Sequence, residues 1–328
     1  MTCFDDLNIE LLLEIFHYFT FTELLHAFFG LQQRLDNVIR TYPACIHLSK
    51  VIDQLEFQSF SFQCRSLILS GLDLQPFQTN YSHLNFSSLR DVKFIKMNLL
   101  TLYSFIKILP IHQLESIIIG RFTWQYYPID LYTQVWSIIM NAVNGNRLHH
   151  LRLPYHIRYW NIENLPDDYT TLRRASLEYI SASQMLTFIS HTPNLRRFKT
   201  CLASPHKDHF QYVVSLSKLN HLTLSLHDQW SLEEIQQLFT ICPYLKYLIL
   251  RLEVHEETKI ILRPNIWQTL IDEELPHLIF LRLRLNCIIV HPDMKNYDCE
   301  NKFNRTEYWL QRKPHFQVTI KEIHRKLL

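Results

Sequence analysis

The sequence predicts an α/β fold in which three short N-terminal helices precede a solenoid with a concave parallel sheet. The first observation is an apolar, strand-like pattern that recurs from Cys64 onward. The second is a set of amphipathic segments of helical period between the copies. The third is the strongly apolar run Leu7–Ile39, which divides into three helical blocks.

The repeat is a six-residue pattern with mostly apolar side chains at positions one, four and six. Positions four and six share one face of a short strand, because side chains alternate along it. Six of the eight steps between successive copies span 23 to 26 residues. The nine copies are CRSLIL from Cys64, LRDVKF from Leu89, LESIII from Leu114, LHHLRL from Leu148, LRRASL from Leu172, LRRFKT from Leu195, LNHLTL from Leu219, LKYLIL from Leu245 and LIFLRL from Leu278.

Helices are expected between the strands. Stacked strand–helix units of this length share a continuous core and curve, which predicts the solenoid. A doubly wound α/β fold is the alternative, but the chain has only four glycines and no glycine-rich phosphate loop. Ser231 and Glu234 predict a capping box, and a closing strand is expected at Phe316–Ile320. The expected helices are Leu99–Leu109, Leu131–Val143, Ser183–Ile189, His209–Leu216, Ser231–Ile241 and Asn265–Leu275.

From about residue 60 to 290 this pattern resembles the leucine-rich-repeat family, of the degenerate, longer kind. The family's asparagine at position nine occurs only at Asn286, so the usual asparagine ladder is absent. The two long steps between copies predict insertions near Arg121–Tyr127 and Glu253–Arg263. We assign residues 63–328 to this leucine-rich-repeat-like solenoid and its C-terminal cap.

The first forty residues carry more apolar surface than three short helices can hide. One face of the first helix holds Leu11, Leu12, Ile15, Phe16 and Phe19, and two further helices follow, the second capped by Thr22 and the third from about Gln32 to Arg40. A segment of this size is near the lower limit for independent folding. A partner or the repeats should therefore cover part of this surface.

The pattern L-x-x-E-L-L-L-E-I-F-x-Y-F, followed by E-L-L-x-A-F and L-x-x-R-L, resembles an F-box over residues 5–42, with 43–62 as a connecting segment. Glu10 matches the family's acidic residue and Arg34 its basic residue in the third helix. Asn8 replaces the family's proline, and Leu35 stands where a tryptophan is usual.

The resemblance implies a non-catalytic substrate receptor of a cullin-type ubiquitin ligase. The F-box would bind the small Skp-type adaptor, and the repeats would hold the substrate. The alternative is that these helices only cap the open end of the solenoid. The implied adaptor-binding residues are Leu7, Leu11, Leu12, Ile15, Phe16, Leu24, Leu25 and Phe28.

Positions three, five and seven of the strands should face outward on the concave surface. Eight of these 27 positions are Lys or Arg, whereas 33 such residues in 328 would give about three. Cations beside aromatic rings suit carboxylate or phosphate groups. We expect a protein substrate with an acidic or phosphorylated segment; alternatively, the cations only keep the strand face soluble. The predicted substrate-binding residues are Arg152, Arg174, Arg197, Lys199, Tyr247, Arg251, Phe280, Arg282 and Arg284, with Lys93 also on this face.

The sequence gives no reason to expect catalysis, a metal or a cofactor. His206, Asp208 and His209 lack further ligands nearby, and no nucleophile elbow or metalloprotease motif occurs. Seven scattered cysteines without a C-x-x-C spacing, and no signal peptide or membrane span, predict a cytoplasmic or nuclear protein. A net charge of +2 does not favour nucleic acid as a partner. A nucleic-acid-binding repeat protein and an interaction scaffold outside ubiquitination stay open as alternatives.

Overall fold

The computed structural model describes residues 7–19, 21–42, 44–48, 64–71, 86–120, 129–144, 147–153, 169–203, 217–227, 230–255, 261–289, 303, 305–312 and 315–324. The chain is α/β, with parallel strands and helices. It divides into two compact units, Met1–Pro154 and Tyr155–Leu328, each considered by itself.

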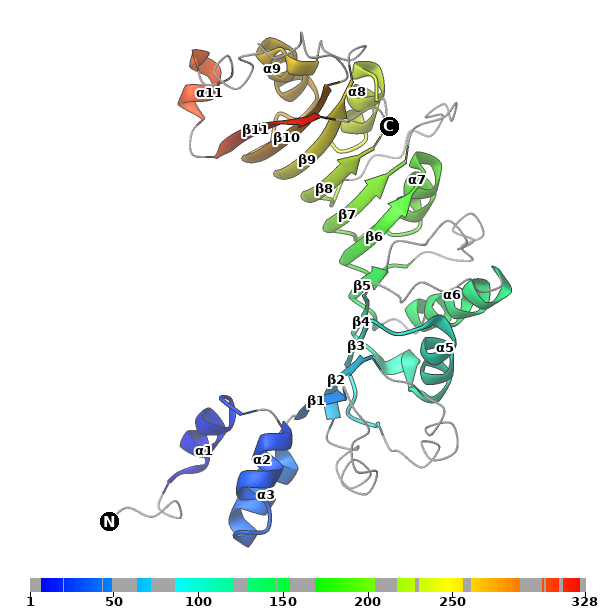
Figure 1. The fold of residues 1–328 in the computed structure, drawn as a ribbon, viewed down its shortest axis with the longest axis vertical. Helices are drawn as coiled ribbons and strands as arrows, with labels where there is room; N and C mark the ends of the chain where they lie inside the picture. The colour runs from blue at the N-terminus through cyan, green and yellow to red at the C-terminus, as the bar shows by residue number, and fades with distance from the viewer. Residues whose placement is uncertain are drawn as a thin grey trace. The chain divides into compact units, whose positions relative to one another are not determined.

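The first unit begins with three short helices and continues into parallel strands. The helices are α1 (Ile9–Phe16), α2 (Phe21–Phe28) and α3 (Gln33–Thr41). The strands pair in chain order, and α5 and α6 lie on one side of them (Figure 1). The remaining elements are β1 (Ala44–Leu48), β2 (Cys64–Ser70), β3 (Asp91–Ile95), α5 (Leu99–Ile108), the 3-10 turn η4 (Ile111–Gln113), β4 (Ser116–Ile119), α6 (Ile129–Asn144) and β5 (His150–Leu153).

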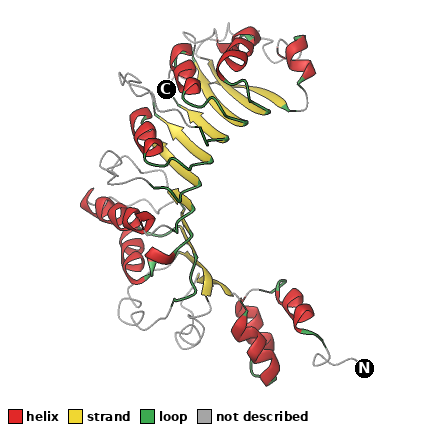
Figure 2. Cartoon of the chain, turned by 180° about the vertical axis from the view of Figure 1, so that it is seen from behind, coloured by secondary structure: helices red, strands yellow, loops and turns green. Residues whose placement is uncertain are grey.

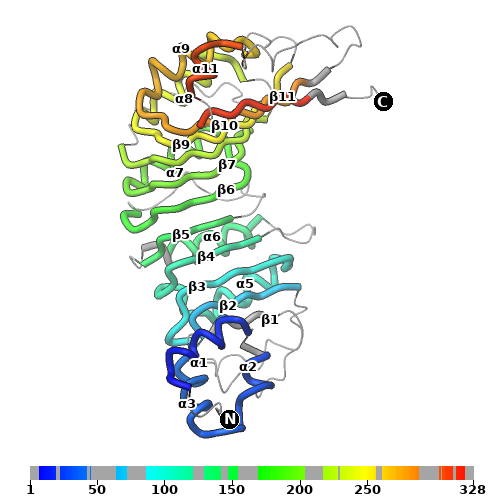
Figure 3. The backbone as a smooth tube through the Cα atoms, turned by 90° about the vertical axis from the view of Figure 1, so that its left-hand side faces the viewer, coloured from blue at the N-terminus to red at the C-terminus, as the bar shows by residue number. Residues whose placement is uncertain are grey.

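The second unit repeats the strand–helix alternation. Its strands also pair parallel in chain order, and α7, α8 and α9 cover one face of them (Figure 2). Figure 3 shows the strands of this unit lying side by side. The elements are β6 (Arg174–Ile180), α7 (Ala182–Ser190), β7 (Arg197–Leu202), β8 (His221–Leu226), α8 (Leu232–Thr240), β9 (Tyr247–Val254), α9 (Pro264–Glu274), β10 (Phe280–Ile289), α11 (Glu307–Gln311) and β11 (Phe316–His324).

The core of each unit is built from the repeated pattern. Positions one, four and six of all nine copies are buried, except that Leu278 is partly exposed. Buried side chains of the helices, such as Leu186 on α7 and Leu238 on α8, belong to the same apolar core. The burial follows from the alternation, since one strand face meets helices and the other does not.

A second regularity lies in the backbone just before most of these strands. The carbonyl at position two of one copy accepts hydrogen bonds from two consecutive amides of the next copy. Arg173 O accepts from Arg196 N at 2.9 Å and from Arg197 N at 3.1 Å, and Asn220 O accepts from Lys246 N and Tyr247 N in the same way. These bonds fix the register of neighbouring strands, so equivalent positions of successive copies lie opposite one another.

Most of the elements predicted from the sequence are confirmed. Five of the expected helices correspond to α5–α9, and the expected strand from Phe316 is β11, which extends to His324. The capping box at Ser231 is present, with the Ser231 hydroxyl accepting from Glu234 N at 3.2 Å. The expected helix His209–Leu216 and the insertion at 121–127 lie outside the described residues.

Three features were not predicted. Residues 43–62 were expected to be a connection, but they contain β1, which pairs with β2. A second capping box opens α7 at Ser181 and Gln184. The short helix α11 packs Trp309 against Phe316 of β11, with ring centroids 5.9 Å apart. Among the described helices, none is long and apolar enough to cross a membrane.

Candidate functional site

Two surfaces contain most of the binding residues that the sequence predicts. The first is the helical surface, formed by the exposed and partly exposed apolar residues of α1, α2 and the turns that follow them. The second is the open face, formed by positions three, five and seven of strands β6–β10. The helical surface belongs to the first unit and the open face to the second.

The three N-terminal helices pack around one aromatic side chain. Phe16 is fully buried, with its ring centroid 5.6 Å from Phe28 and 5.9 Å from Tyr42, edge-on to the latter. Phe28 also meets Phe19 edge-on at 5.5 Å. Burial raises the pKa of Tyr42, whose hydroxyl lies 3.1 Å from His17 Nδ1. This cluster joins all three helices.

The position that departs from the F-box pattern at Asn8 has a clear local role. Asn8 is the N-cap of α1, and its Oδ1 accepts from Leu11 N at 2.8 Å. Proline at a first helical turn and asparagine at an N-cap both favour helix initiation, so the exchange preserves the start of α1. Arg34 of α3 donates to Leu7 O at 2.5 Å and ties α3 to the beginning of α1.

The predicted adaptor-binding residues divide between core and surface. Leu12, Phe16 and Leu24 are buried in the bundle, so an approaching partner cannot contact them directly. Leu7, Ile15, Leu25 and Phe28 are partly exposed, and Leu11 is 45% exposed.

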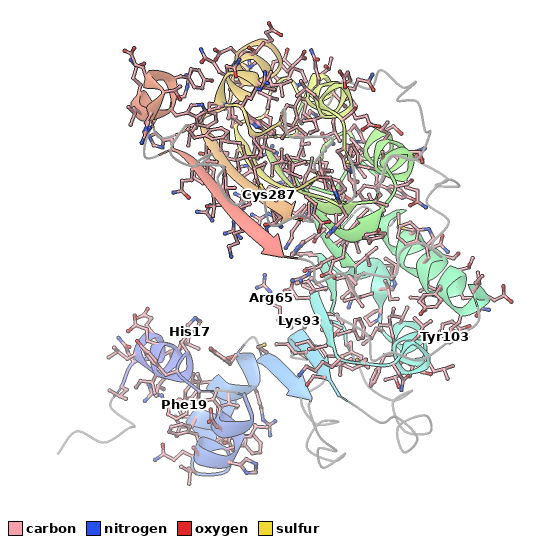
Figure 4. All side chains as sticks on the ribbon, turned by 45° about the horizontal axis from the view of Figure 1, so that its top comes forward. His17, Phe19, Arg65, Lys93, Tyr103 and Cys287 are labelled. Atoms are coloured by element: carbon pink, nitrogen blue, oxygen red, sulfur yellow. The ribbon has the colours of Figure 1, made fainter. Side chains whose placement is uncertain are left out.

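Four further exposed residues were not in the predicted set. Ile9 is 55% exposed and Tyr18 is 90% exposed, and Phe19 and Leu31 are exposed as well. An open hollow of about 590 Å³ on α1 is lined by Leu13, Glu14, His17 and Tyr18. Figure 4 labels His17 and Phe19, which follow the C-terminal end of α1. Of the five exposed large apolar residues described within residues 7–42, four therefore lie on α1 and the turn after it, and the fifth, Leu31, lies between α2 and α3.

The open face presents three rows of side chains that run across the strands. The first row is Arg174, Arg197, His221, Tyr247 and Phe280, each opposite the next in register. The second is Ser176, Lys199, Thr223, Ile249 and Arg282, and the third includes Ser225, Arg251 and Arg284. Neighbouring residues within a row are one strand spacing apart, about 4.8 Å.

Positive charge dominates this face. None of its fifteen positions is buried; six are Lys or Arg, and Glu178 is the one carboxylate among them. Within the described residues, no ion pair involves Arg174, Arg197, Lys199, Arg251 or Arg284. The face therefore combines a positive potential with cations that have no neutralising carboxylate in the described part of the chain.

Rings occupy the middle and end of the first row. His221 and Tyr247 stack with centroids 4.1 Å apart and an interplanar angle of 12°, and Phe280 follows at 6.3 Å from Tyr247. Arg282 lies 5.7 Å over the Phe280 ring and donates to Gln317 Oε1 at 3.0 Å. Burial, with added repulsion from Arg197 and Arg174, lowers the pKa of His221.

The corresponding face of the first unit carries less charge. Arg152 is exposed on β5 and Lys93 is exposed on β3, where Figure 4 shows it on the side of the sheet away from Tyr103 of α5. Asp91 lies one strand over from Ser116, and burial together with Glu115 raises its pKa despite the opposing effect of Arg65. Of the predicted substrate-binding residues, only Arg152 belongs to this unit; the other eight share the open face.

Two arginines were missed by the sequence reasoning. Arg173 and Arg196 precede Arg174 and Arg197 and are exposed. They occupy position two, which strand alternation assigns to the core side, so the predicted surface does not include them. The signal was visible as the tripeptide Leu-Arg-Arg in two consecutive copies.

The described residues hold no group of three or more His, Cys, Asp or Glu side chains arranged to bind a metal. The candidate ligands at His206, Asp208 and His209 lie outside the described residues. Cys242 is buried, and burial raises the pKa of its thiol to about 12, so the thiolate form is disfavoured. No protein-family model matches the chain, and no curated protein matches it.

Proposed function

We propose that this chain is the substrate-recognition subunit of an SCF-type ubiquitin ligase. In this proposal α1–α3 form an F-box that binds the Skp-type adaptor and, through it, the cullin. The strand–helix copies form a leucine-rich-repeat-like solenoid whose open face holds a protein substrate. The chain itself supplies no chemistry, because ubiquitin transfer belongs to other subunits of such a ligase.

The observation that carries the proposal is the exposed apolar surface of α1 beside a filled core. Phe16, Leu12 and Leu24 already complete the packing of the helices, whereas Ile9 and Leu11 stay about half exposed. Burying the exposed part of each would contribute roughly 1 kcal/mol. The exposed parts of these two side chains add no burial energy in the isolated chain, so a partner that covers α1 would explain why they are apolar.

The two departures from the F-box pattern are compatible with this role. Asn8 caps α1, which replaces the helix-starting role of proline. Leu35 is buried within the bundle, so the exchange of tryptophan for leucine changes the core of the helices and leaves the exposed residues of α1 in place. Arg34 supports the same arrangement through its bond to Leu7 O.

The open face supports the substrate-binding half of the proposal. Six cations and one carboxylate on fifteen exposed or partly exposed positions favour a partner with negative charge. The rings of Tyr247 and Phe280 add apolar contact area beside those cations. A protein segment that joins acidic and apolar residues matches both properties.

Copurification tests the adaptor-binding half. We expect the wild-type chain, expressed in cells, to recover the Skp-type adaptor and the cullin, and Leu11→Asp plus Ile15→Asp to lose both. The matched control is Leu100→Asp plus Ile129→Asp, which places two charges at exposed apolar positions on α5 and α6. The control should recover the adaptor as the wild type does.

The proposal fails if the wild type recovers no adaptor, or if the α1 variant recovers as much as the control. An interaction scaffold outside ubiquitination would then be favoured by the same exposed surfaces. A nucleic-acid-binding role would instead require RNA or DNA binding whose affinity falls steeply with salt.

A further inference from the structure

Two consecutive arginine pairs lie on neighbouring strands of the second unit. Arg174 is the first residue of β6 and follows Arg173, and Arg197 is the first residue of β7 and follows Arg196; we call these four residues the arginine quartet. Arg174 pairs with Arg197 in register, and Arg173 O accepts from both Arg196 N and Arg197 N. All four residues are exposed. The side chains of Arg174 and Arg197 therefore leave the backbone about one strand spacing apart, and Arg173 and Arg196 each directly precede one of them in the chain.

This arrangement is unfavourable in the chain alone. Like charges directly opposite on adjacent strands repel and destabilise the pairing. Within the described residues no carboxylate pairs with the quartet, and Glu178, the one acid on the open face, lies four residues further along β6 than Arg174. An anion bound between the two strands would remove the repulsion, which is the physical reason to expect one.

The charge of the expected anion follows from the number of cations. One guanidinium can hold a carboxylate through two parallel hydrogen bonds, which leaves the opposite arginine without a partner. A phosphate monoester carries a charge between about −1.5 and −2 at neutral pH and has three acceptor oxygens. It can accept from Arg174 and Arg197 together, so a phosphate fits the pair better than a single carboxylate.

The same row then changes from cations to rings. His221, Tyr247 and Phe280, which we call the ring row, continue directly from Arg197. His221 has a lowered pKa and lies 2.6 Å from Asn220 Oδ1, so it extends the row as a neutral hydrogen-bonding group at neutral pH. The row thus passes from a site for negative charge to a surface for apolar contact.

The stacking of these rings decides between two kinds of ligand. Unspecific binding of single-stranded nucleic acid depends on free aromatic faces on which bases stack. One face of Tyr247 is covered by His221 at 4.1 Å and the other lies toward Phe280. The row therefore presents ring edges to a ligand, which suits apolar side chains of a peptide better than nucleobases.

We infer that the arginine quartet and the ring row bind a phosphorylated segment of a protein, with the phosphate on Arg174 and Arg197 and an apolar side chain on Tyr247 and Phe280. The inference rests on the proposed function in taking the ligand to be a substrate protein. Tyr247 lies about 12 Å from the midpoint between the two arginines, two and a half strand spacings away. An extended peptide covers that distance in about four residues at roughly 3.3 Å each.

The test uses the full-length purified chain and fluorescent nonapeptides with a fixed central phosphoserine and degenerate flanks, measured by fluorescence anisotropy. We expect at least tenfold tighter binding than for the same library with serine, and further enrichment of peptides with Leu or Phe four residues from the phosphoserine. Free inorganic phosphate should compete only weakly, because it cannot reach the ring row.

Two variants and one control variant locate the site. Arg174→Gln plus Arg197→Gln should reduce phosphopeptide affinity at least tenfold without lowering the thermal midpoint, since it removes a repulsion. Arg147→Gln plus Arg263→Gln removes two exposed cations elsewhere and should bind as the wild type does. Tyr247→Ala should abolish the preference for an apolar residue while keeping the preference for phosphate.

Several results would overturn the inference. Equal binding of the phosphorylated and unphosphorylated libraries, or equal losses in both double variants, would show that the quartet is not a phosphate site. Tighter binding of a single-stranded RNA 20-mer that also depends on Arg174 and Arg197 would replace the peptide with nucleic acid. Leu11→Asp plus Ile15→Asp should keep phosphopeptide binding, so failure of the adaptor proposal is distinguished from failure of this one.

Discussion

Phe16 offers the sharpest test of how α1–α3 are held together. The change is Phe16→Ala, which removes a fully buried ring with two aromatic neighbours, Phe28 at 5.6 Å and Tyr42 at 5.9 Å. Replacing a buried phenylalanine by alanine costs about 3–5 kcal/mol, and each aromatic pair accounts for about 0.5–1.5 kcal/mol beyond the buried area. The expected loss is therefore about 3–5 kcal/mol.

That loss is as large as the stability such a segment can have. At roughly 0.05–0.15 kcal/mol per residue, a segment of about 35 residues contributes about 2–5 kcal/mol. Phe16→Ala should accordingly unfold α1–α3, while the second unit keeps its structure, because the substitution touches none of its core.

Hydrogen exchange followed by mass spectrometry measures this directly. Peptides from α1, α2 and α3 should lose protection in Phe16→Ala, whereas a peptide from β9 should exchange as in the wild type. Tyr18→Ala is the matched control, because it deletes an aromatic ring that is 90% exposed and should change stability by less than about 0.5 kcal/mol. Full protection of α1–α3 in Phe16→Ala would refute the assignment of Phe16 as the centre of the bundle.

Three further outcomes are expected. Ser231→Ala removes the N-cap of α8 and should lower the free energy of unfolding by about 1 kcal/mol in urea titrations; an unchanged midpoint would contradict the role of the capping box. Burial and Arg197 lower the pKa of His221 in the folded chain. As the pH falls below about 6.5, the unfolded chain therefore binds a proton at this histidine before the folded chain does, and the free energy of unfolding decreases. His221→Gln should lose less stability than the wild type between pH 7.5 and 5.5 in thermal melts, and an equal loss would assign the pH dependence elsewhere. Cys242, whose pKa burial raises to about 12, should react with a thiol reagent only after unfolding, whereas exposed Cys45 should react in the native chain; equal rates would show that Cys242 is accessible.

The strand pattern could be predicted from the sequence because the physics behind it is local. Side-chain alternation and the burial of one face select apolar residues at positions four and six, and this holds even where the residue is unusual, as with buried Thr200. The pattern does not predict β1 because Pro43 occupies the place of the first apolar residue, although Ile46 and Leu48 pair with Leu67 and Leu69 as the pattern requires.

The candidate surfaces were less predictable because they depend on which neighbours cover a side chain. The helical periodicity of α1 places Leu11 and Leu12 on the same broad apolar face, yet Leu12 is buried and Leu11 is half exposed. The packing of the three helices against one another separates the two. Sequence periodicity identifies an apolar face, whereas the boundary between core and docking surface within that face is a tertiary property.

The arginine quartet is the opposite case, in which strand alternation assigns exposed side chains to the core. Strand alternation assigns Arg173 and Arg196 to the core side, but both lie just before their strands begin, where the chain has not yet entered the sheet. Their backbone groups join the carbonyl ladder while their side chains stay exposed. A residue just before the first residue of a strand can therefore carry a charge that the buried face of the strand excludes. The repetition of Leu-Arg-Arg in two successive copies places two such charged residues at the same end of the open face.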